Sequence, residues 1–208
     1  LRTGGGTDGK AFDIHVNQQN RLRIDSSGDV GIGVAPTTAY GNALQIHDTG
    51  TSGANLRLTD STSGSGTGNG FEIIQIGVNN FLINREAGSM SFFTSGSEAM
   101  LIDSSGRVGI GATPNTNIDA SSFPAALTLG DQGVLLGNAS GAQIGTNFYW
   151  SGSAFKYLGS GKASRMYQLA GNIVFENTDT SGSTDAALTL SEAMRIHSSG
   201  NVSIGDTS

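Results

Sequence analysis

Seventeen aspartates and glutamates are the residues of this sequence with the clearest capacity for catalysis. A glycosidase, for example, needs two carboxylates held about 5–10 Å apart in a cleft. Glu72, Glu86 and Glu176 stand in or beside expected strands and could line such a groove. Most aspartates instead stand beside Gly, Ser or Thr, where the carboxylate bonds the backbone of a turn. Turn and solvent roles are the favoured interpretation, so no catalytic residue is assigned and we expect no enzymatic activity.

Metal and thiol chemistry has little support in the sequence. The absence of cysteine excludes a thiol nucleophile, a disulfide and a Cys-based zinc site. His15, His47 and His197 stand singly, without HxH or HxxxH spacing, and no Asp-rich calcium loop is found. Identical chains can each supply one His to an ion on a threefold axis, and His197 is the weak metal candidate because it stands in a hairpin expected to pack near neighbouring chains. We expect no metal and no cofactor.

Aromatic side chains are densest in NFYW and FKY, at residues 147–150 and 155–157. Tyr149, Trp150 and Tyr157 are candidate glycan contacts, because exposed Trp and Tyr rings stack on sugars. In a hairpin, alternation places Phe148 and Trp150 on one face and Tyr149 on the other. The alternative, which we favour, makes one face part of the core and lets Tyr149 cover a seam between chains.

The elements that would position these residues are indicated by a thirteen-residue segment that occurs three times. RLRIDSSGDVGIG at 21–33 returns as AMLIDSSGRVGIG at 99–111 and as AMRIHSSGNVSIG at 193–205. Apolar residues alternate with polar residues or glycine on both sides of the centre, which predicts two strands joined by a turn. An Asp that opens a type I turn bonds the backbone ahead of it, and the Gly that closes the turn accepts a positive φ. The expected turn-defining residues are Asp25, Gly28, Asp103, Gly106 and Gly200.

The third copy departs from the pattern at two positions. His197 replaces the turn aspartate, and Ser203 replaces the first glycine of VGIG. Both changes are small and polar, so they question close packing at that glycine rather than the hairpin itself.

Proline-containing breaks follow the first two copies, VAP at 34–36 and ATP at 112–114, and fresh apolar alternation then begins. The expected units are a partial repeat at 1–36 that ends in a hairpin, a second repeat at 43–114 and a third at 126–208. No segment has the pattern of a stable helix, since the two helix-like stretches are single turns. The predicted fold is all-β, an elongated repetitive fibre of short strands and hairpins.

Composition indicates that one chain has too little apolar material for an interior of its own. Hydrophobic residues are 36% of the 208 residues, and 32 residues are glycine. Ordering a hairpin costs about 1–2 kcal/mol per residue, whereas each of its four buried aliphatic side chains returns about 1.5–3 kcal/mol. The missing stabilisation must come from a neighbouring unit, as in solenoids, or from identical chains that wind together. We favour intertwined chains, because glycines opposite the apolar positions permit close approach of backbones.

Charge and hydropathy exclude two classes of partner. The net charge is −6 and the basic residues are scattered, so nothing displaces the counterions of a nucleic acid. No apolar run approaches the roughly 18–20 residues of a membrane helix, so membrane insertion is not expected.

These features resemble a known class of protein. RIDSSGDVGIG with VAP, and LIDSSGRVGIGATP, are similar to the shaft repeats of tail fibres from tailed bacteriophages and prophages. Residues 70–106 and 147–205 resemble longer units of the same fibres. The resemblance implies a parallel, intertwined homotrimer with a β-helix-like or β-prism-like shaft, located in the virion and assembled in the host cytoplasm. The implied partners are further copies of the chain, other virion tail proteins and a host surface glycan.

The expected function is that of a structural shaft segment of a phage tail fibre, which supports attachment to the host cell. One alternative is a glycan- or receptor-binding module of the fibre that uses the aromatic residues. A second is a polysaccharide depolymerase, and a third is a bacterial surface adhesin with similar repeats.

Overall fold

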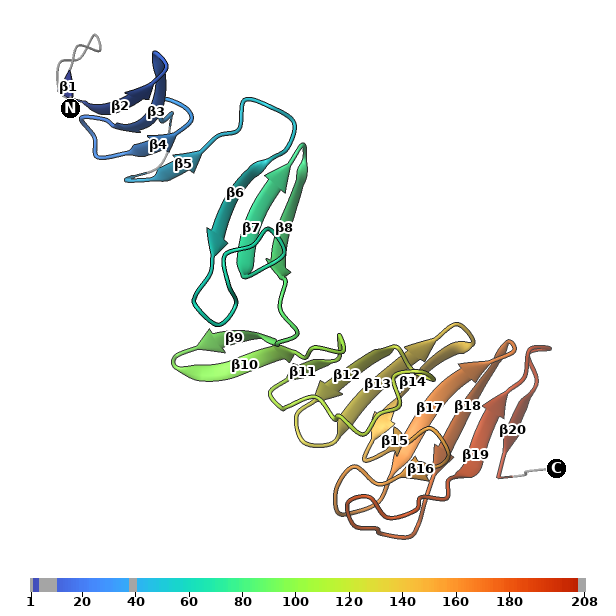
Figure 1. The fold of residues 1–208 in the computed structure, drawn as a ribbon. Coiled ribbons are helices and arrows are strands. Elements are labelled where there is room, and N and C mark those ends of the chain that lie inside the picture. The colour runs from blue at the N-terminus through green and yellow to red at the C-terminus, as the bar shows by residue number, and fades with distance from the viewer. Residues whose placement is uncertain (1, 4–10, 38–40, 206–208) are drawn as a thin grey trace. The chain divides into compact units, whose positions relative to one another are not determined.

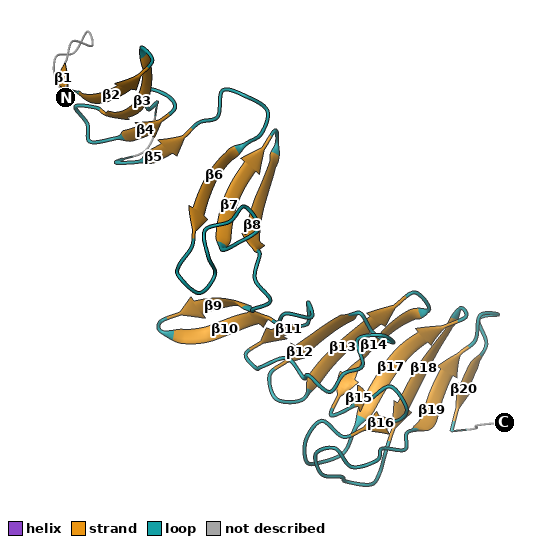
Figure 2. Ribbon diagram, in the orientation of Figure 1, coloured by secondary structure: helices purple, strands orange, loops and turns teal. Residues whose placement is uncertain are grey.

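The computed structural model describes residues 2–3, 11–37 and 41–205. These residues form strands and loops, with no helix among them (Figure 2), which confirms the predicted all-β class. The chain divides into two compact units, Leu1–Ala87 and Gly88–Ser208. The boundaries expected from the sequence at 1–36, 43–114 and 126–208 stay predictions.

The first unit contains two separate sheets (Figure 1). In the five-stranded sheet the spatial order follows the chain, β4 pairs with β5 in parallel, and the other pairs are antiparallel. The second sheet is an antiparallel meander of three strands. The strands are β1 (Arg2–Thr3), β2 (Phe12–Val16), β3 (Gln19–Ile24), β4 (Val30–Ile32), β5 (Leu44–Ile46), β6 (Ala54–Leu58), β7 (Phe71–Ile76) and β8 (Asn79–Asn84).

The second unit is built on one ten-stranded sheet, with a two-stranded hairpin, β15–β16, beside it (Figure 1). The sheet order is β20-β19-β18-β17-β14-β13-β12-β11-β10-β9, and only β11–β12 is a parallel pair among these strands. The strands are β9 (Met90–Thr94), β10 (Ser97–Ile102), β11 (Val108–Ile110), β12 (Ala125–Leu129), β13 (Gly133–Asn138), β14 (Gly141–Thr146), β15 (Tyr149–Trp150), β16 (Phe155–Lys156), β17 (Ser164–Leu169), β18 (Asn172–Asn177), β19 (Ser191–Ile196) and β20 (Val202–Ile204).

The repeated segment forms a tight hairpin at each of its three places, β3–β4, β10–β11 and β19–β20. The Oδ1 atom of Asp25 accepts hydrogen bonds from the backbone N–H groups two and four residues ahead, at 2.8 and 3.0 Å. Asp103 does the same at 2.9 and 3.0 Å. Gly28, Gly106 and Gly200 have φ of +88°, +79° and +88°, a conformation that L side chains rarely adopt.

The third hairpin keeps its backbone geometry without the carboxylate. The carbonyl of His197 accepts the N–H of Gly200 at 2.8 Å, and the N–H of His197 donates to the carbonyl of Asn201 at 2.8 Å. The His197 ring faces the strand opposite, where its Nε2 lies 2.9 Å from the Ser203 hydroxyl oxygen. The two departures from the repeat therefore form a pair in contact.

Each hairpin also has a third strand and a β-bulge at the same place. The bulged residues are Arg21, Ala99 and Ala193, which the ladders with β2, β9 and β18 skip. The carbonyl of each bulged residue accepts the N–H of the last glycine of the hairpin, at 3.2, 3.0 and 2.9 Å. The recurring element is thus a bulged three-stranded meander, which is longer than the segment that recurs in sequence.

The proline-containing connections explain the glycine in the middle of β4 and β11. A Cβ at Gly31 would lie 2.2 Å from the carbonyl oxygen of Val34, and one at Gly109 would lie 2.0 Å from that of Ala112. Both connections therefore fold back across their own hairpin, on the face opposite the apolar side chains of the strand.

Alanine at Gly109 is expected to destabilise the second unit by about 1–3 kcal/mol, because its Cβ would overlap a backbone oxygen that cannot move away alone. Ser203→Ala is the matched control at the same position of the third hairpin. It keeps an existing Cβ and loses one hydrogen bond, so we expect a cost of about 1 kcal/mol or less. Denaturant unfolding of both variants measures the difference; equal costs would contradict the close approach at Gly109.

The sequence predicted that a single chain would have no interior of its own, and for the second unit this is wrong. Segments between β14 and β17, and between β18 and β19, supply side chains that pack on one face of the sheet. In the first unit, among the described residues, Ile74 is the only buried hydrophobic side chain. The cluster in the second unit consists of Ile118, Phe123, Ala126, Val134, Leu136, Phe148, Tyr149, Tyr157, Ala163 and Leu188.

Candidate functional site

The opposite face of the ten-stranded sheet carries a continuous row of apolar side chains, one from every strand. Register places each member directly beside the next, so neighbouring side chains are in cross-strand contact range. We call this line the apolar row. From β9 to β20 it runs Met90, Ile102, Val108, Leu127, Leu135, Ile144, Met166, Phe175, Met194 and Ile204.

The whole face around the apolar row lacks charge. Strand alternation places only Ala, Gly, Val, Leu, Ile, Met, Phe, Ser, Thr, Asn and Gln on it. Three of the four methionines, Met90, Met166 and Met194, lie in the row, and Met100 lies beside it on the same face, opposite Phe92 and Ile110. We call this surface of β9–β14 and β17–β20 the uncharged face.

The charged residues of the same strands lie on the other face, where Arg165, Glu176, Glu192 and Arg195 are partly buried and Glu98 is exposed. Arg165 pairs with Glu176 at 2.7 Å, and Arg195 pairs with Glu192 at 2.6 Å. The ring of Phe155, from the β15–β16 hairpin, lies over the Arg165 guanidinium at 4.0 Å. The face that carries the charges and the core cluster is therefore covered by the chain itself along much of its length, whereas the uncharged face is open.

Solvent reaches the uncharged face at many points. Leu135, Ile144 and Ile204 are 38%, 46% and 76% exposed. A shallow hollow of about 320 Å³ lies near Val108 and Leu127, and another of about 400 Å³ lies near Met166. An apolar surface of this extent on a single chain marks an interaction site.

Both sheets of the first unit divide their side chains in the same way. In the five-stranded sheet, Ile14, Leu22, Ile32 and Ile46 form one cross-strand row without charge. On its other face Asp13, which is buried, lies 3.8 Å from Arg23. The uncharged face of this sheet is also partly exposed; Ile14 and Ile32 are 43% and 39% exposed.

In the three-stranded sheet, Leu56, Ile73 and Leu82 lie side by side on an open face, at 40%, 47% and 54% exposure. The opposite face holds Glu72, which is completely buried. Its two oxygens accept hydrogen bonds from Arg57 and from Arg85 (Nε 2.9 Å), and together the three residues form a compact ion triad.

The glycine-rich connection between β6 and β7 lies against the ion triad. Arg57 donates to the carbonyl oxygen of Gly66 in this connection, at 3.4 Å. Hydrogen bonding from Arg85, joined by that from Arg57, holds the pKa of Glu72 below its ordinary value of 4.5. The triad thus fastens a covering loop to the charged face.

Acid is expected to weaken the three-stranded sheet through Glu72. Because the pKa of Glu72 is lowered in the folded protein, the contribution of the triad is fully present above the ordinary value of 4.5 and is lost as the pH falls through the lower folded value. Glu72→Gln should be less stable than the unmodified chain at pH 7, and the difference should shrink in acid. Thermal melts of both proteins between neutral and acidic pH measure this; a pH-independent difference would contradict it.

The structure places the candidate glycan contacts in the interior, which corrects that interpretation. Tyr149 and Tyr157 are 2% and 3% exposed, and Trp150 is half-buried against Phe155, with ring centroids 4.9 Å apart. Phe148 is also buried, so alternation does not separate it from Tyr149. The reason is that the β15–β16 hairpin is packed into the core, where both sides of a strand are covered.

Both tyrosine hydroxyls are satisfied internally. Tyr149 donates to Asp185 Oδ1 at 2.5 Å, and Tyr157 donates to the carbonyl of Thr180 at 2.8 Å. Burial, together with the Asp185 carboxylate, raises the pKa of Tyr149 to about 12. Asp185 itself has φ of +64°, so this contact holds a strained loop rather than a sugar ring.

The carboxylates and histidines do not converge on a reaction centre. Glu72 and Glu176 are paired with arginines, and Glu86 accepts the N–H of Gly70 at 2.8 Å. Within residues 11–37 and 41–205, no group of three or more His, Asp or Glu side chains is placed to hold a metal ion. His197 is half-buried and engaged with Ser203.

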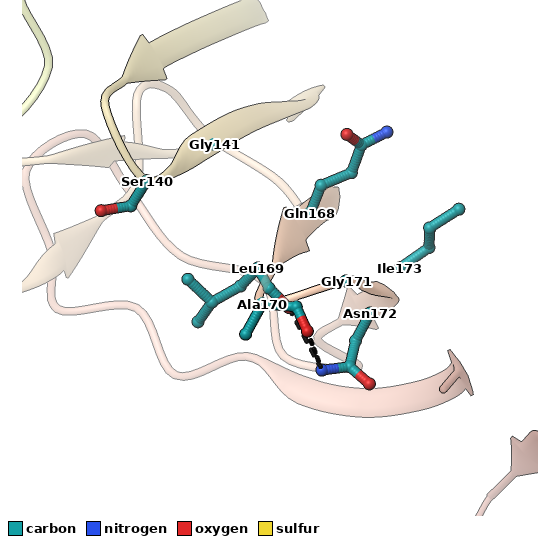
Figure 3. Close-up of a pocket in the computed structure, with 8 residues that line it drawn as sticks. All are labelled: Ser140, Gly141, Gln168, Leu169, Ala170, Gly171, Asn172 and Ile173. Atoms are coloured by element: carbon teal, nitrogen blue, oxygen red, sulfur yellow. Dashed lines mark hydrogen bonds between the residues drawn. The ribbon is translucent and has the colours of Figure 1, made fainter. Parts of the chain in front are cut away.

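A hollow of about 340 Å³ lies at the β17–β18 turn and the start of β14 (Figure 3). It is lined by turn backbone, aliphatic side chains and the amides of Gln168 and Asn172. The Asn172 amide donates to the carbonyls of Leu169 and Ala170, at 3.2 and 3.4 Å. The lining holds one hydroxyl, that of Ser140, and no acidic or basic side chain to activate it, so we interpret this hollow as a feature of the turn.

None of the described residues belongs to a helix long and apolar enough to cross a bilayer. Comparison of the sequence with protein-family models and with curated proteins gives no match. The uncharged faces of the sheets, which sequence reasoning did not locate, are therefore the strongest candidate functional surface. In each strand, charged and uncharged side chains alternate in a way that indicates such a face. The faces could be recognised only when the pairing of the strands showed that the uncharged sides lie next to one another.

Proposed function

We propose that the chain is a structural shaft segment of a phage tail fibre and acts as a homotrimer without enzymatic activity. Its role is mechanical: it supports host-cell attachment by holding the receptor-binding part of the fibre away from the particle. Other virion tail proteins are its partners in the assembled fibre. The assignment to tail fibres comes from the resemblance of the thirteen-residue segments and their spacing.

The uncharged faces are the observation that carries the proposal. Leaving apolar surface in water costs about 25 cal/mol per Å², so a row of ten such side chains favours association strongly. A copy of the same chain can cover this face without burying a single charge, because neither side brings one. Repetition of the arrangement in three sheets favours a partner that follows the chain along its length, which an identical parallel chain does.

The covered faces support the same role. Ion pairs and hydrogen-bonded loops lie on them, so in each sheet the chain itself covers one face and leaves the other face exposed for a partner. Thin sheets of this kind become stiff when their open sides share an interior, because the apolar contacts and the β-ladders then resist bending together.

Light scattering on the purified protein tests the proposal directly. We expect a mass of three chains of 21.2 kDa each. Peroxide oxidation should leave the four methionines largely unmodified in the assembly, because all of them lie on the uncharged face. A one-chain mass with a sharp, cooperative melt would overturn the proposal.

Glycan titration monitored by Trp150 fluorescence provides a second check. Trp150 is the single tryptophan of the chain and lies beside the buried tyrosines. A shaft segment should give no saturable change on addition of surface polysaccharide. A saturable change would replace the shaft by the glycan-binding alternative.

A further inference from the structure

Asn69 and Gly70, at the end of the glycine-rich connection between β6 and β7, form the only Asn-Gly pair in the sequence. In such a pair the backbone nitrogen of glycine can attack the Cγ atom of the preceding side chain, because glycine has no side chain to obstruct the approach. The cyclic imide that forms then opens to an acid. Asn69 is therefore the asparagine of this chain with the greatest intrinsic tendency to deamidate.

The fold requires glycine at position 70. Its φ is +87°, a conformation that L side chains rarely adopt, and a Cβ there would lie 2.3 Å from the carbonyl oxygen of Leu58. A bulkier residue, which would slow the reaction by hindering the backbone nitrogen, is thus excluded by the structure. Any protection of Asn69 has to come from contacts instead.

Hydrogen bonds hold both of the reacting groups. The Asn69 amide donates to the carbonyl oxygen of Ser63. The N–H of Gly70 donates to Oε1 of Glu86 at 2.8 Å, and this carboxylate belongs to the segment that follows β8. The Gly70 nitrogen must lose its proton and turn toward Cγ before it can attack. The negative charge of Glu86 opposes the first step, and the hydrogen bond opposes the second.

We propose that Asn69 is a deamidation site that Glu86 keeps closed while the connection stays folded. When the hydrogen bond opens, hydroxide removes the Gly70 proton and the nitrogen bonds to Cγ. The bond from Cγ to Nδ2 breaks, and Nδ2 takes a proton from water and leaves as ammonia. Water then adds to one of the two imide carbonyls, which yields aspartate or isoaspartate. The net reaction consumes one water and releases one ammonia, without oxidation or reduction.

The product cannot restore the closed connection. A carboxylate oxygen in place of Nδ2 would face the carbonyl oxygen of Ser63, and two acceptors repel each other. Isoaspartate also lengthens the backbone by one methylene group, beside Gly64 and Gly66, where a Cβ would already lie 3.0 and 3.1 Å from the Asn69 amide. Because Arg57 of the ion triad donates to the Gly66 carbonyl, deamidation should loosen the cover over the triad.

The inference does not depend on the proposed self-association. The connection lies against the ion triad on the charged face of the three-stranded sheet, whereas copies would join through the uncharged face. A one-chain mass in light scattering would overturn the proposed function and leave the deamidation site unaffected.

Peptide mapping by mass spectrometry, on the full chain incubated in mildly alkaline buffer, measures the reaction at Asn69. We expect the folded chain to deamidate there at least about tenfold more slowly than the chain in denaturant, because opening of the connection limits the rate. Glu86→Ala should raise the rate in the folded chain about threefold to tenfold, the effect of one lost hydrogen bond. An unchanged rate in Glu86→Ala would overturn the inference.

Glu86→Gln is the matched control, because its amide oxygen can still accept the N–H of Gly70. It should react more slowly than Glu86→Ala. If Glu86 instead acted as the base that takes the Gly70 proton, both substitutions would slow the reaction, and the inference would fall. Glu86→Asp withdraws the carboxylate from Gly70 but keeps its charge. Should Glu86→Ala show no cooperative melt, faster deamidation in Glu86→Asp supports the inference and an unchanged rate overturns it.

Asn69→Asp carries the aspartate product from the start and tests the consequence. The N–H of Arg85 donates to the Gly70 carbonyl at 3.0 Å, so its amide exchange reports whether the connection is closed. We expect the Arg85 amide to exchange several-fold faster in Asn69→Asp than in the unmodified chain. Equal exchange rates would overturn the inferred loosening.

Discussion

Lysine in place of Leu135 is expected to reduce the assembled protein to single chains. Leu135 lies in the middle of the apolar row, between Leu127 and Ile144, and is 38% exposed in one chain. In the proposed trimer the same position is enclosed, and each copy would bury an ammonium group without a partner, at a cost of several kcal/mol per ion. In a lone chain, lysine at a half-exposed site costs within about 1 kcal/mol.

Val78→Lys is the matched control for this experiment. Val78 is 90% exposed in the turn between β7 and β8, so it is apolar and exposed but outside every cross-strand row. We expect this variant to keep the three-chain mass measured by light scattering. A Leu135→Lys protein that also keeps that mass would show that the uncharged face does not join the copies.

The second large effect is expected from Phe148→Ala, which should destabilise the second unit by about 3–5 kcal/mol. Phe148 is completely buried and meets Phe155 edge to face, with ring centroids 6.2 Å apart. Its removal leaves a cavity in the buried hydrophobic cluster of the second unit. Few other apolar side chains are fully buried, so few neighbours can shift into the cavity and reduce its volume.

Phe93→Ala provides the comparison, since Phe93 lies in β9 and is 61% exposed. This change should cost about 1 kcal/mol or less, because an exposed ring has little packing to lose. Denaturant unfolding, followed by far-ultraviolet circular dichroism, reports both values. If the two substitutions cost the same, the core around Phe148 does not hold the second unit together.

The two predictions address different sources of stability. Phe148 tests the interior that segments around β15 and β16 build within one chain, and Leu135 tests the interior that copies would share. The composition predicted that the apolar side chains of a hairpin contribute too little free energy to offset the entropy lost when the hairpin becomes ordered. This still describes the first unit, where one hydrophobic side chain among the described residues is buried. It failed for the second unit because long connections carry aromatic side chains back onto the sheet.

The sequence correctly predicted those turns whose hydrogen bonds join residues only a few positions apart. Asp25 and Asp103 occupy turns in which the carboxylate caps N–H groups two and four residues ahead, and the closing glycines have positive φ. The turn survives the change to His197 because its backbone bonds remain. Such features depend on the covalent neighbours of a residue, which a sequence states explicitly.

The glycan candidates could not be placed in the same way. A run of aromatic residues indicates a packed cluster or an exposed platform equally well, and only distant segments decide between them. Asp185 and Thr180, far along the chain from Tyr149 and Tyr157, accept their hydroxyl hydrogen bonds and close the core over them. The sequence contains both partners but no sign that they meet.

The pentapeptide Ala-Ala-Leu-Thr-Leu shows the division most clearly, because it occurs twice and folds in two ways. At 125–129 it is strand β12 between β11 and β13; its small residues Ala126 and Thr128 are buried, and both leucines lie on the uncharged face. At 186–190 it forms only an isolated bridge to Lys156, and Leu188 is buried in the core. Alternation, turns and the all-β class were determined by the sequence itself, since they follow from neighbours along the chain. Which side of a strand is covered was decided by the tertiary structure alone, because the same five residues place their leucines on an open face at 125–129 and bury Leu188 in the core at 186–190.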